Sequence, residues 1–321
     1  MTHSPYEQMQ RAVDIVNSSP HPSNKIAATV FGHDPDGMAF SVSRTNYWPH
    51  SIEKHLGFHA RIGNSSGTIH AETACLLAAP FTNETSLCIT DPFCPNCAKN
   101  IAEAGIRTIY IDHKGFDKDF AARRGEHFED LSLKICEKAG IAVHKLFRKE
   151  QRTEPVVEIP HGYIPAEAGP VEFEFLTGAD RASFEALVAR KRRLHRGRKI
   201  AIAVARDNYE GIFGLTARAH PAIGYTIATD GDLIRQHQGK YSVILEPVNR
   251  LLMNAPRRGL KIVDGMMFCS VVPTAREQVN MAGAGLAEIY IEELTRARDD
   301  NAMAAMTTLK GAGIIAYREI F

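Results

Sequence analysis

Two hydrophobic periods alternate along the first 150 residues. Short apolar runs of strand length recur at 26–31, 38–42, 86–90, 106–111 and 141–146. Segments with apolar residues at helical spacing lie before and between them, at 5–18, 70–79, 94–104 and 120–139. The turn formers HDPDG separate the first two runs and predict a hairpin. Strands that alternate with helices predict an α/β layer fold, and the hairpin predicts a mixed sheet with one antiparallel edge.

The second half of the chain repeats the order of the first. The segment 245–256 (LEPVNRLLMNAP) aligns with 69–80 (IHAETACLLAAP) at an offset of 176 residues. The segment 284–291 (AGLAEIYI) aligns with 104–111 (AGIRTIYI) at an offset of 180 residues. Further strand-like runs keep the same order, at 198–205, 211–217, 266–271 and 312–317. Matches in a conserved order predict a duplicated domain.

A proline-rich segment separates the two halves. Residues 151–170 carry four prolines and no helical period, which predicts an interdomain linker. We therefore expect one domain at 1–150 and a second at 171–321. Each is predicted to be a three-layer domain, with a mixed five-stranded sheet and helices on both faces.

Charge and length narrow the function classes. A chain of 321 residues has room for two domains, and 38 basic against 37 acidic residues give a net charge of +1. This balance makes a nucleic-acid partner unlikely. The one strongly basic run, ARKRRLHRGRK at 189–199, is typical of the solvated end of a helix. The alternative, a phosphate or RNA contact, has no interleaved aromatic residues to support it.

The sequence shows no clear signal peptide, membrane span or disulfide pattern. The N-terminal segment MTHSPYEQMQRAVDIV lacks a basic region followed by an apolar run, so we expect no signal peptide. No apolar stretch approaches the length of a membrane span, so we expect no membrane partner. Six cysteines in this length do not suggest a disulfide scaffold. We expect a cytoplasmic protein.

Four residues of the first half form the candidate chemical centre: His70 and Glu72 in IHAE, and Cys94 and Cys97 in CPNC. One imidazole and two thiolates leave the fourth position of a tetrahedral zinc ion open, as in catalytic zinc sites. Cys94 and Cys97 lie one helical turn apart, so both sulfurs can face one ion at a helix N-terminus, which favours thiolates. Glu72, in the first turn of its helix, can reach the water in the open position and carry protons.

A CxxC pair also occurs in closed structural zinc sites, in redox pairs and by chance. The redox interpretation leaves His70 and Glu72 without a role. A closed site needs a fourth ligand, and Cys75 and Cys88 both lie in apolar segments that are typical of a core. The pattern therefore favours catalytic zinc.

The aligned second half lacks this centre. The positions of His70, Glu72, Cys94 and Cys97 are taken by Glu246, Val248, Thr274 and Glu277. Valine cannot transfer a proton, and the aligned residues keep neither the imidazole nor the thiolates. We expect one Zn²⁺ per chain, in the first domain only, and a second domain without catalytic activity.

The motif pair His-x-Glu and Cys-x-x-Cys resembles the cytidine and deoxycytidylate deaminase superfamily over about residues 5–147. CPNCAKNIAEAGI (94–106) and SSPHPSNKIAATV (18–30) are most similar to the deoxycytidylate branch. The resemblance implies two tandem cytidine-deaminase-like domains, the second one degenerate. It implies His70, Cys94 and Cys97 as zinc ligands and Glu72 as the proton shuttle. Zinc-bound hydroxide would attack the amino-bearing ring carbon, and ammonia would leave.

The same resemblance suggests substrate contacts. Asn46, in TNYWP, would contact the base or sugar. Ser23, Asn24 and Lys25 would line the sugar or phosphate side. Ala71, between the two motif residues, is a further candidate, and Trp48 either stacks on the base or belongs to the core or a lid. The sequence departs from the family at Phe93, which separates Pro92 from Cys94, and at Ile26-Ala27-Ala28, where the family has Val-Gly-Ala.

These features predict a hydrolytic deaminase of a nucleobase, nucleoside or nucleotide, with deoxycytidylate- or cytidine-like substrates first. The alternatives are a guanine-, adenine- or pterin-type substrate, a tRNA-editing deaminase, and a zinc-stabilised binding protein. The second domain serves either as a packing partner or as a source of substrate contacts. A homodimer of the two-domain chain is a further hypothesis.

Overall fold

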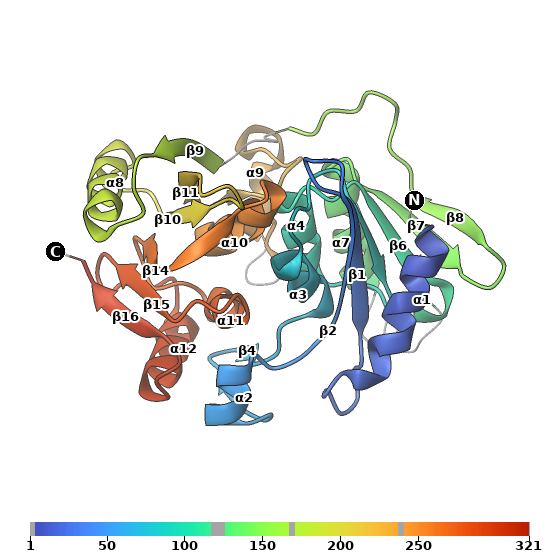
Figure 1. Cartoon of the computed structure of the whole chain (residues 1–321), viewed down its shortest axis with the longest axis horizontal. Helices are drawn as coiled ribbons and strands as arrows, with labels where there is room; N and C mark the ends of the chain where they lie inside the picture. Colours follow the sequence, from blue (N-terminus) through green and yellow to red (C-terminus); the bar gives the residue numbers. More distant parts are fainter. Residues whose placement is uncertain (1–3, 117–125, 167–170, 237–240, 321) are drawn as a thin grey trace.

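The computed structural model describes residues 4–116, 126–166, 171–236 and 241–320. We call the described residues up to 157 the first domain and those from 171 onward the second domain. Each domain is built on one six-stranded mixed sheet, and the two sheets lie on either side of a group of helices (Figure 1).

The sheet of the first domain has the order β2-β1-β5-β6-β7-β8. β1 pairs antiparallel with β2 and β5, whereas β5, β6 and β7 are parallel and β8 returns antiparallel to β7. The strands are β1 (Ala27–His33), β2 (Ala39–Thr45), β5 (Ser86–Ile89), β6 (Thr108–Asp112), β7 (Ala142–Phe147) and β8 (Arg152–Val157).

Alternating residues of β1 point to opposite faces of this sheet. Val30 belongs to the large central core, whereas its neighbour Phe31 packs with Met9 of the N-terminal helix. Both faces are therefore covered, as the sequence predicts. The helices are α1 (Pro5–Ile15), η1 (Val16–Ser18), α2 (His50–Leu56), α3 (Ala71–Ala78), α4 (Pro95–Glu103), α5 (His113–Phe116) and α7 (Glu126–Lys138). The predicted start of the last helix, near residue 120, lies outside the described residues.

The second domain repeats five of the six strands of the first, namely β2, β1, β5, β6 and β7. Its sheet order is β16-β15-β14-β10-β11-β9, so that β11, β10, β14, β15 and β16 correspond to β2, β1, β5, β6 and β7. Its strands are β9 (Val171–Leu176), β10 (Ile200–Arg206), β11 (Ile212–Arg218), β14 (Lys261–Cys269), β15 (Glu288–Ile291) and β16 (Ala316–Glu319). Its helices are α8 (Arg181–Leu194), α9 (Ile227–Gln236), α10 (Pro247–Arg257), α11 (Ala275–Gly283) and α12 (Asp300–Gly311).

The α/β class with two tandem mixed sheets is confirmed, but each sheet has six strands rather than the predicted five. β8 falls inside the segment expected to be a linker. The sequence did not predict β8 because Pro155 lies within it, and proline is tolerated in a sheet only on edge strands such as this one. β9 forms the edge beside β11 and carries the alternating sequence VEFEFL. The two extra strands lie at opposite edges of the shared five-stranded core.

Two short strand pairs complete the fold. The hairpin of β3 (Arg61–Ile62) and β4 (Ser65–Ser66) lies just before α3. β12 (His220–Pro221) and β13 (Ile244–Leu245) pair just before α10. Each pair therefore leads into the corresponding helix of its own domain.

The two domains share one core. α10 packs on α3 and α4, and α11 contacts α3 and β4. Glu103 of α4 and Arg250 of α10 form an ion pair in which both side chains are fully buried. Arg250 also donates to the carbonyls of His220 and Pro221, both at 2.9 Å. This buried ion pair fixes how the two domains meet, because either charge alone would be costly to bury.

No helix of the described residues combines the length and the hydrophobicity that crossing a bilayer needs.

Candidate metal centre and active site

The starts of α3 and α4 bring the four predicted residues together. His70 and Cys94 are the N-cap residues of α3 and α4, both with extended backbone, and Pro95 fixes the first helical position of α4. Glu72 and Cys97 lie in the first turns of these helices. Both helices therefore direct their positive ends at the same place.

Three ligand atoms converge there. His70 Nδ1 lies 3.2 Å from Cys97 Sγ and 3.7 Å from Cys94 Sγ, and the two sulfurs are 3.6 Å apart. Two sulfurs bound to one tetrahedral zinc ion at about 2.3 Å each would lie about 3.7 Å apart. Among the described residues, this is the one group of three or more His, Cys, Asp or Glu with converging ligand atoms.

The electrostatics of the site suit a cation. The hydrogen bond from Cys97, together with the nearby His70, lowers the pKa of the Cys94 thiol well below its ordinary value. Glu72 is 2% exposed, and burial raises the pKa of its carboxyl. Glu72 Oε2 has no hydrogen-bond partner among the described residues. A buried acceptor without a donor, beside two sulfurs and an imidazole, fits a metal ion with a water molecule at its fourth position.

A cavity of about 240 Å³ opens onto this group. Of the residues predicted from the sequence, six line it: Asn24, Asn46, His70, Ala71, Glu72 and Cys94. Its remaining lining residues are His21, Ile26, Ser66, Thr68 and Pro92. The metal-binding group therefore lies in the wall of a pocket large enough for a small ring.

The amide of Asn46 organises the loop beside this cavity. Its Nδ2 donates to the carbonyl of Asn24 at 2.8 Å, and its Oδ1 accepts from Ser19 Oγ at 2.8 Å and from the backbone N–H of Ile26 at 3.0 Å. These bonds hold the loop 19–26 against the pocket. Asn46 thus acts on the pocket through the loop that it fixes.

His21 is a pocket residue that the sequence interpretation missed. Its Nδ1 accepts the backbone N–H of Asn24 at 3.0 Å, which leaves the proton of a neutral ring on Nε2. Burial and the nearby His70 lower the pKa of His21 and favour that neutral form. The sequence feature that could have identified His21 is its position between two prolines in SPHPS, which places a titratable ring on a rigid loop.

Three predicted contact residues do not line the cavity. Trp48 is 5% exposed, stacks on His21 at 5.5 Å between ring centroids and meets Phe58 edge to face at 5.0 Å. Burying its large apolar surface places it behind His21, not in the pocket. Lys25 Nζ donates to the carbonyl of Asn17 at 2.9 Å, and the backbone N–H of Ser23 faces His21 Nδ1 at 3.4 Å.

The second domain reaches the wall of this cavity. Arg276, in the first turn of α11, donates from Nη1 to the carbonyl of Thr68 at 2.6 Å and from Nη2 to Ser66 Oγ at 3.4 Å. Thr68 and Ser66 line the cavity and precede His70. No local motif marks Arg276, because its role arises only from the packing of the two domains.

The second domain has the two corresponding helix starts but lacks the His and Cys residues that form the candidate metal site of the first. Glu246 and Thr274 are the N-cap residues of α10 and α11, as His70 and Cys94 are of α3 and α4. The described residues of this region hold no converging group of metal ligands.

The first three cations of the basic run at 189–199 are paired within the protein. Lys191 Nζ lies 2.9 Å from both Glu172 and Glu174, and Arg190 lies 2.6 Å from Glu174. Arg192 pairs with Glu292 at 2.5 Å. These three cations therefore bind the edge strand β9 and a neighbouring loop.

No protein-family model matches the chain. A curated protein of Aliivibrio fischeri, described as an uncharacterized deaminase in the luxG 3′ region, is 29% identical over 126 residues. These are 39% of this chain and 81% of that protein.

Two solved structures of the dCMP deaminase from the cyanophage S-TIM5 also match, one in complex with dCMP and dUMP and one in apo form. Each match covers 44% of this chain. They cover 94% and 96% of those chains, at 20% and 22% identity and with TM-scores of 0.30 and 0.29.

The match to a protein described as a deaminase supports a resemblance to deaminases over 39% of this chain. Sequence similarity and site geometry thus agree on one class of enzyme, the hydrolytic deaminases.

Proposed function

We propose that the first domain, within residues 1–150, is a zinc-dependent deaminase of a nucleobase, nucleoside or nucleotide, with cytidine- or deoxycytidylate-like substrates first. The observation that carries this proposal is the convergence of His70, Cys94 and Cys97 beside a buried carboxylate, Glu72, at the wall of a cavity. The second domain, within 171–321, is proposed to be catalytically inactive.

His70 Nδ1 and the two sulfurs would hold the zinc ion. The ion would supply Lewis-acid chemistry and lower the pKa of a water molecule towards about 7. The ligand group is charge-balanced, since two thiolates neutralise one divalent cation.

Glu72 is placed to move protons. Glu72 lines the cavity, its buried Oε2 has no hydrogen-bond partner among the described residues, and burial raises the pKa of its carboxyl. A raised pKa suits a group that must both accept a proton from water and return it to a ring nitrogen or to the departing ammonia.

The remaining walls would bind and orient the ring. His21 presents its Nε2 side as a hydrogen-bond donor when its ring is neutral, and the fixed loop 19–26 defines one side of the cavity. Ser66 and Thr68 form part of another side, held in place by Arg276. The small side chain of Ala71 leaves room beside His70.

The test is ammonia release from the full-length protein over a panel of cytosine, cytidine, dCMP, adenine, guanine and an aminopterin. We expect turnover of at least one compound that is lost on chelation and restored by zinc. A Cys97→Ser variant should lose both zinc and turnover. Release that is insensitive to chelation and to Cys97→Ser would contradict the proposal.

A further inference from the structure

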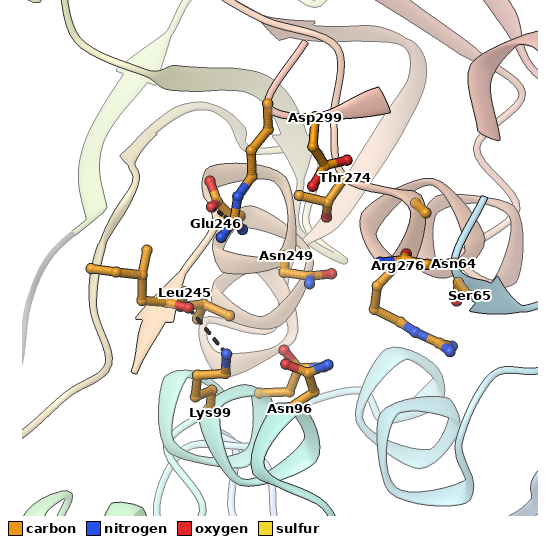
Figure 2. Close-up of a pocket in the computed structure, with 14 residues that line it drawn as sticks. Asn64, Ser65, Asn96, Lys99, Leu245, Glu246, Asn249, Thr274, Arg276 and Asp299 are labelled. Carbon is orange, nitrogen blue, oxygen red and sulfur yellow. Dashed lines mark hydrogen bonds and ion pairs between the residues drawn. The ribbon is translucent and has the colours of Figure 1, made fainter. Parts of the chain in front are cut away.

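A second cavity of about 400 Å³ lies between the two domains, at the starts of α10 and α11. Figure 2 shows Lys99 and Asn96 rising from α4 of the first domain towards Glu246 and Asn249 of the second. The cavity occupies, in the second domain, the place that the metal centre occupies in the first, since Glu246 and Thr274 are the N-cap residues there.

This cavity is not built for a metal ion. Glu277, in the first turn of α11, accepts hydrogen bonds from the backbone N–H groups of Val248 and Asn249 at 2.8 and 3.2 Å. Its other oxygen accepts from Thr274 N and Oγ1 at 2.8 and 2.9 Å. Both oxygens of the Glu277 carboxylate are therefore occupied by hydrogen bonds from the starts of α10 and α11, so this carboxylate is not free to bind a metal ion. We therefore consider an organic ligand for the cavity.

Cations dominate the outer part of the cavity. A second hollow of about 470 Å³ adjoins it and shares Ile244, Glu246 and Arg298 with it, and Lys199 lines this outer hollow. Lys99 is 3% exposed and donates to the carbonyls of Ser242 and Ile244 at 2.7 and 3.1 Å, which uses two of its three N–H groups.

The acidic groups of the same lining are already engaged. Glu246 pairs with Arg298 at 2.5 Å, and Asp299 caps α12 by accepting the backbone N–H of Ala302 at 2.9 Å. Lys99 and Lys199 have no carboxylate partner within hydrogen-bonding distance among the described residues. The outer part of the cavity thus has a surplus of donors, which suits an oxyanion.

Amides line the inner part. Asn100, 3% exposed, lines the cavity, and its Oδ1 has no hydrogen-bond partner among the described residues. Asn249, 8% exposed, uses its Oδ1 to accept from Asn280 at 2.9 Å, which leaves its Nδ2 as a donor. Asn96 faces Asn249 across the cavity in Figure 2. One free acceptor and two amide donors suit a polar ring with both kinds of group.

We propose that the interdomain cavity is a second binding site, for a phosphate-bearing small molecule of mononucleotide size. Its phosphate would lie at the outer end, near Lys199 and Arg298, and its polar ring at the inner end, against Asn100 and Asn249. Lys99 would bridge the two parts. The site does not depend on the activity of the first domain.

The test is hydrogen–deuterium exchange of the full-length, zinc-loaded protein, with uridine 5′-monophosphate, uridine and inorganic phosphate as separate probes. We expect the monophosphate to slow exchange at 244–250 and 274–278, the starts of α10 and α11. Uridine and phosphate should each bind at least about tenfold more weakly, because each fills only one end.

Two variants test the two ends of the proposed site separately, and thermal unfolding checks that each variant is folded. Asn249→Leu, at the inner end, and Lys199→Glu, at the outer end, should each weaken monophosphate binding about tenfold or more. Arg190→Gln, in the same domain but away from the cavity, should not.

Three results would overturn the proposal. They are no protection at α10 and α11, equal protection by phosphate alone, and unchanged affinity in both variants. Protection confined to 21–26 and 68–72 would also overturn it, while supporting nucleotide binding in the first domain. Protection at α10 and α11 in a protein that releases no ammonia would instead uphold this site and count against the proposed function.

Discussion

Glu277 stands in α11 where Cys97 stands in α4, and its carboxylate bridges the two helices of its domain. It accepts the N–H groups of Val248 and Asn249 from α10 and caps α11 through Thr274. The first domain gathers the same two helix starts around His70, Cys94 and Cys97. In the second domain, one carboxylate thus makes the connection between the two helix starts that the proposed metal ligands would make in the first.

Replacing Glu277 by alanine should therefore destabilise the protein without changing its zinc content. The change leaves buried backbone N–H groups without acceptors, each at a cost of about 1–3 kcal/mol. Urea unfolding measures the loss, and metal analysis of the folded variant measures zinc. A variant as stable as the unmodified protein would contradict the structural role of Glu277.

Stability should also depend on pH through this residue. Burial and the nearby Glu246 raise the pKa of Glu277 to about 7. The folded state then holds this proton more tightly than the unfolded state does. The stabilisation that this proton contributes to the folded state is fully present below about pH 4.5, the ordinary pKa of a Glu side chain. It is lost as the pH rises through 7.

Urea unfolding at pH 5 and pH 8 tests this dependence. The unmodified protein should lose more stability between these pH values than the Glu277→Gln variant, which cannot titrate at this position. The same loss in both proteins would show that other groups set the pH dependence.

The buried pair between Glu103 and Arg250 should account for much of the interdomain stability. Arg250→Met leaves the Glu103 charge buried without its partner, and we expect a loss of about 3–5 kcal/mol. The double variant Glu103→Leu/Arg250→Met should recover part of that loss, because no unpaired charge remains. Chemical unfolding of the three proteins checks both expectations. A single variant no less stable than the double one would be inconsistent with this role.

Arg276 should act on the first-domain site although it belongs to the second domain. Arg276→Ala removes its hydrogen bonds to Thr68 and Ser66, and hydrogen bonds of a charged group contribute about 1.5–3 kcal/mol. We expect kcat/KM to fall about tenfold or more, with zinc retained.

Arg276→Lys, which keeps one charge-assisted donor, should restore part of that activity. Arg190→Gln, elsewhere in the second domain, is the matched control. Equal activity in all three variants would mean that the second domain only packs against the first.

The candidate metal centre could be predicted from the sequence because its residues lie in two short local motifs. His70 and Glu72 lie at one helix start, Cys94 and Cys97 at another, and short motifs record such geometry directly. The duplication was equally visible, because Glu246 and Thr274 keep the N-cap positions of the first domain.

Features that depend on tertiary packing could not be predicted from the sequence. Pro155 concealed the edge strand β8, and the contact of Arg276 with Thr68 joins residues more than 200 positions apart. The sequence left open whether Trp48 stacks on the base or belongs to the core or a lid, and in the structure its ring packs against His21 and Phe58. Sequence spacing cannot tell which face of an aromatic ring the fold will bury.

The most direct test of the account compares the unmodified protein with Glu72→Gln at equal zinc content, by ammonia release from the best substrate of the panel. The account predicts about one zinc ion per chain in both proteins and a fall in kcat of about 10²–10⁴-fold in the variant, because glutamine cannot carry a proton. Turnover by Glu72→Gln at the rate of the unmodified protein would contradict it.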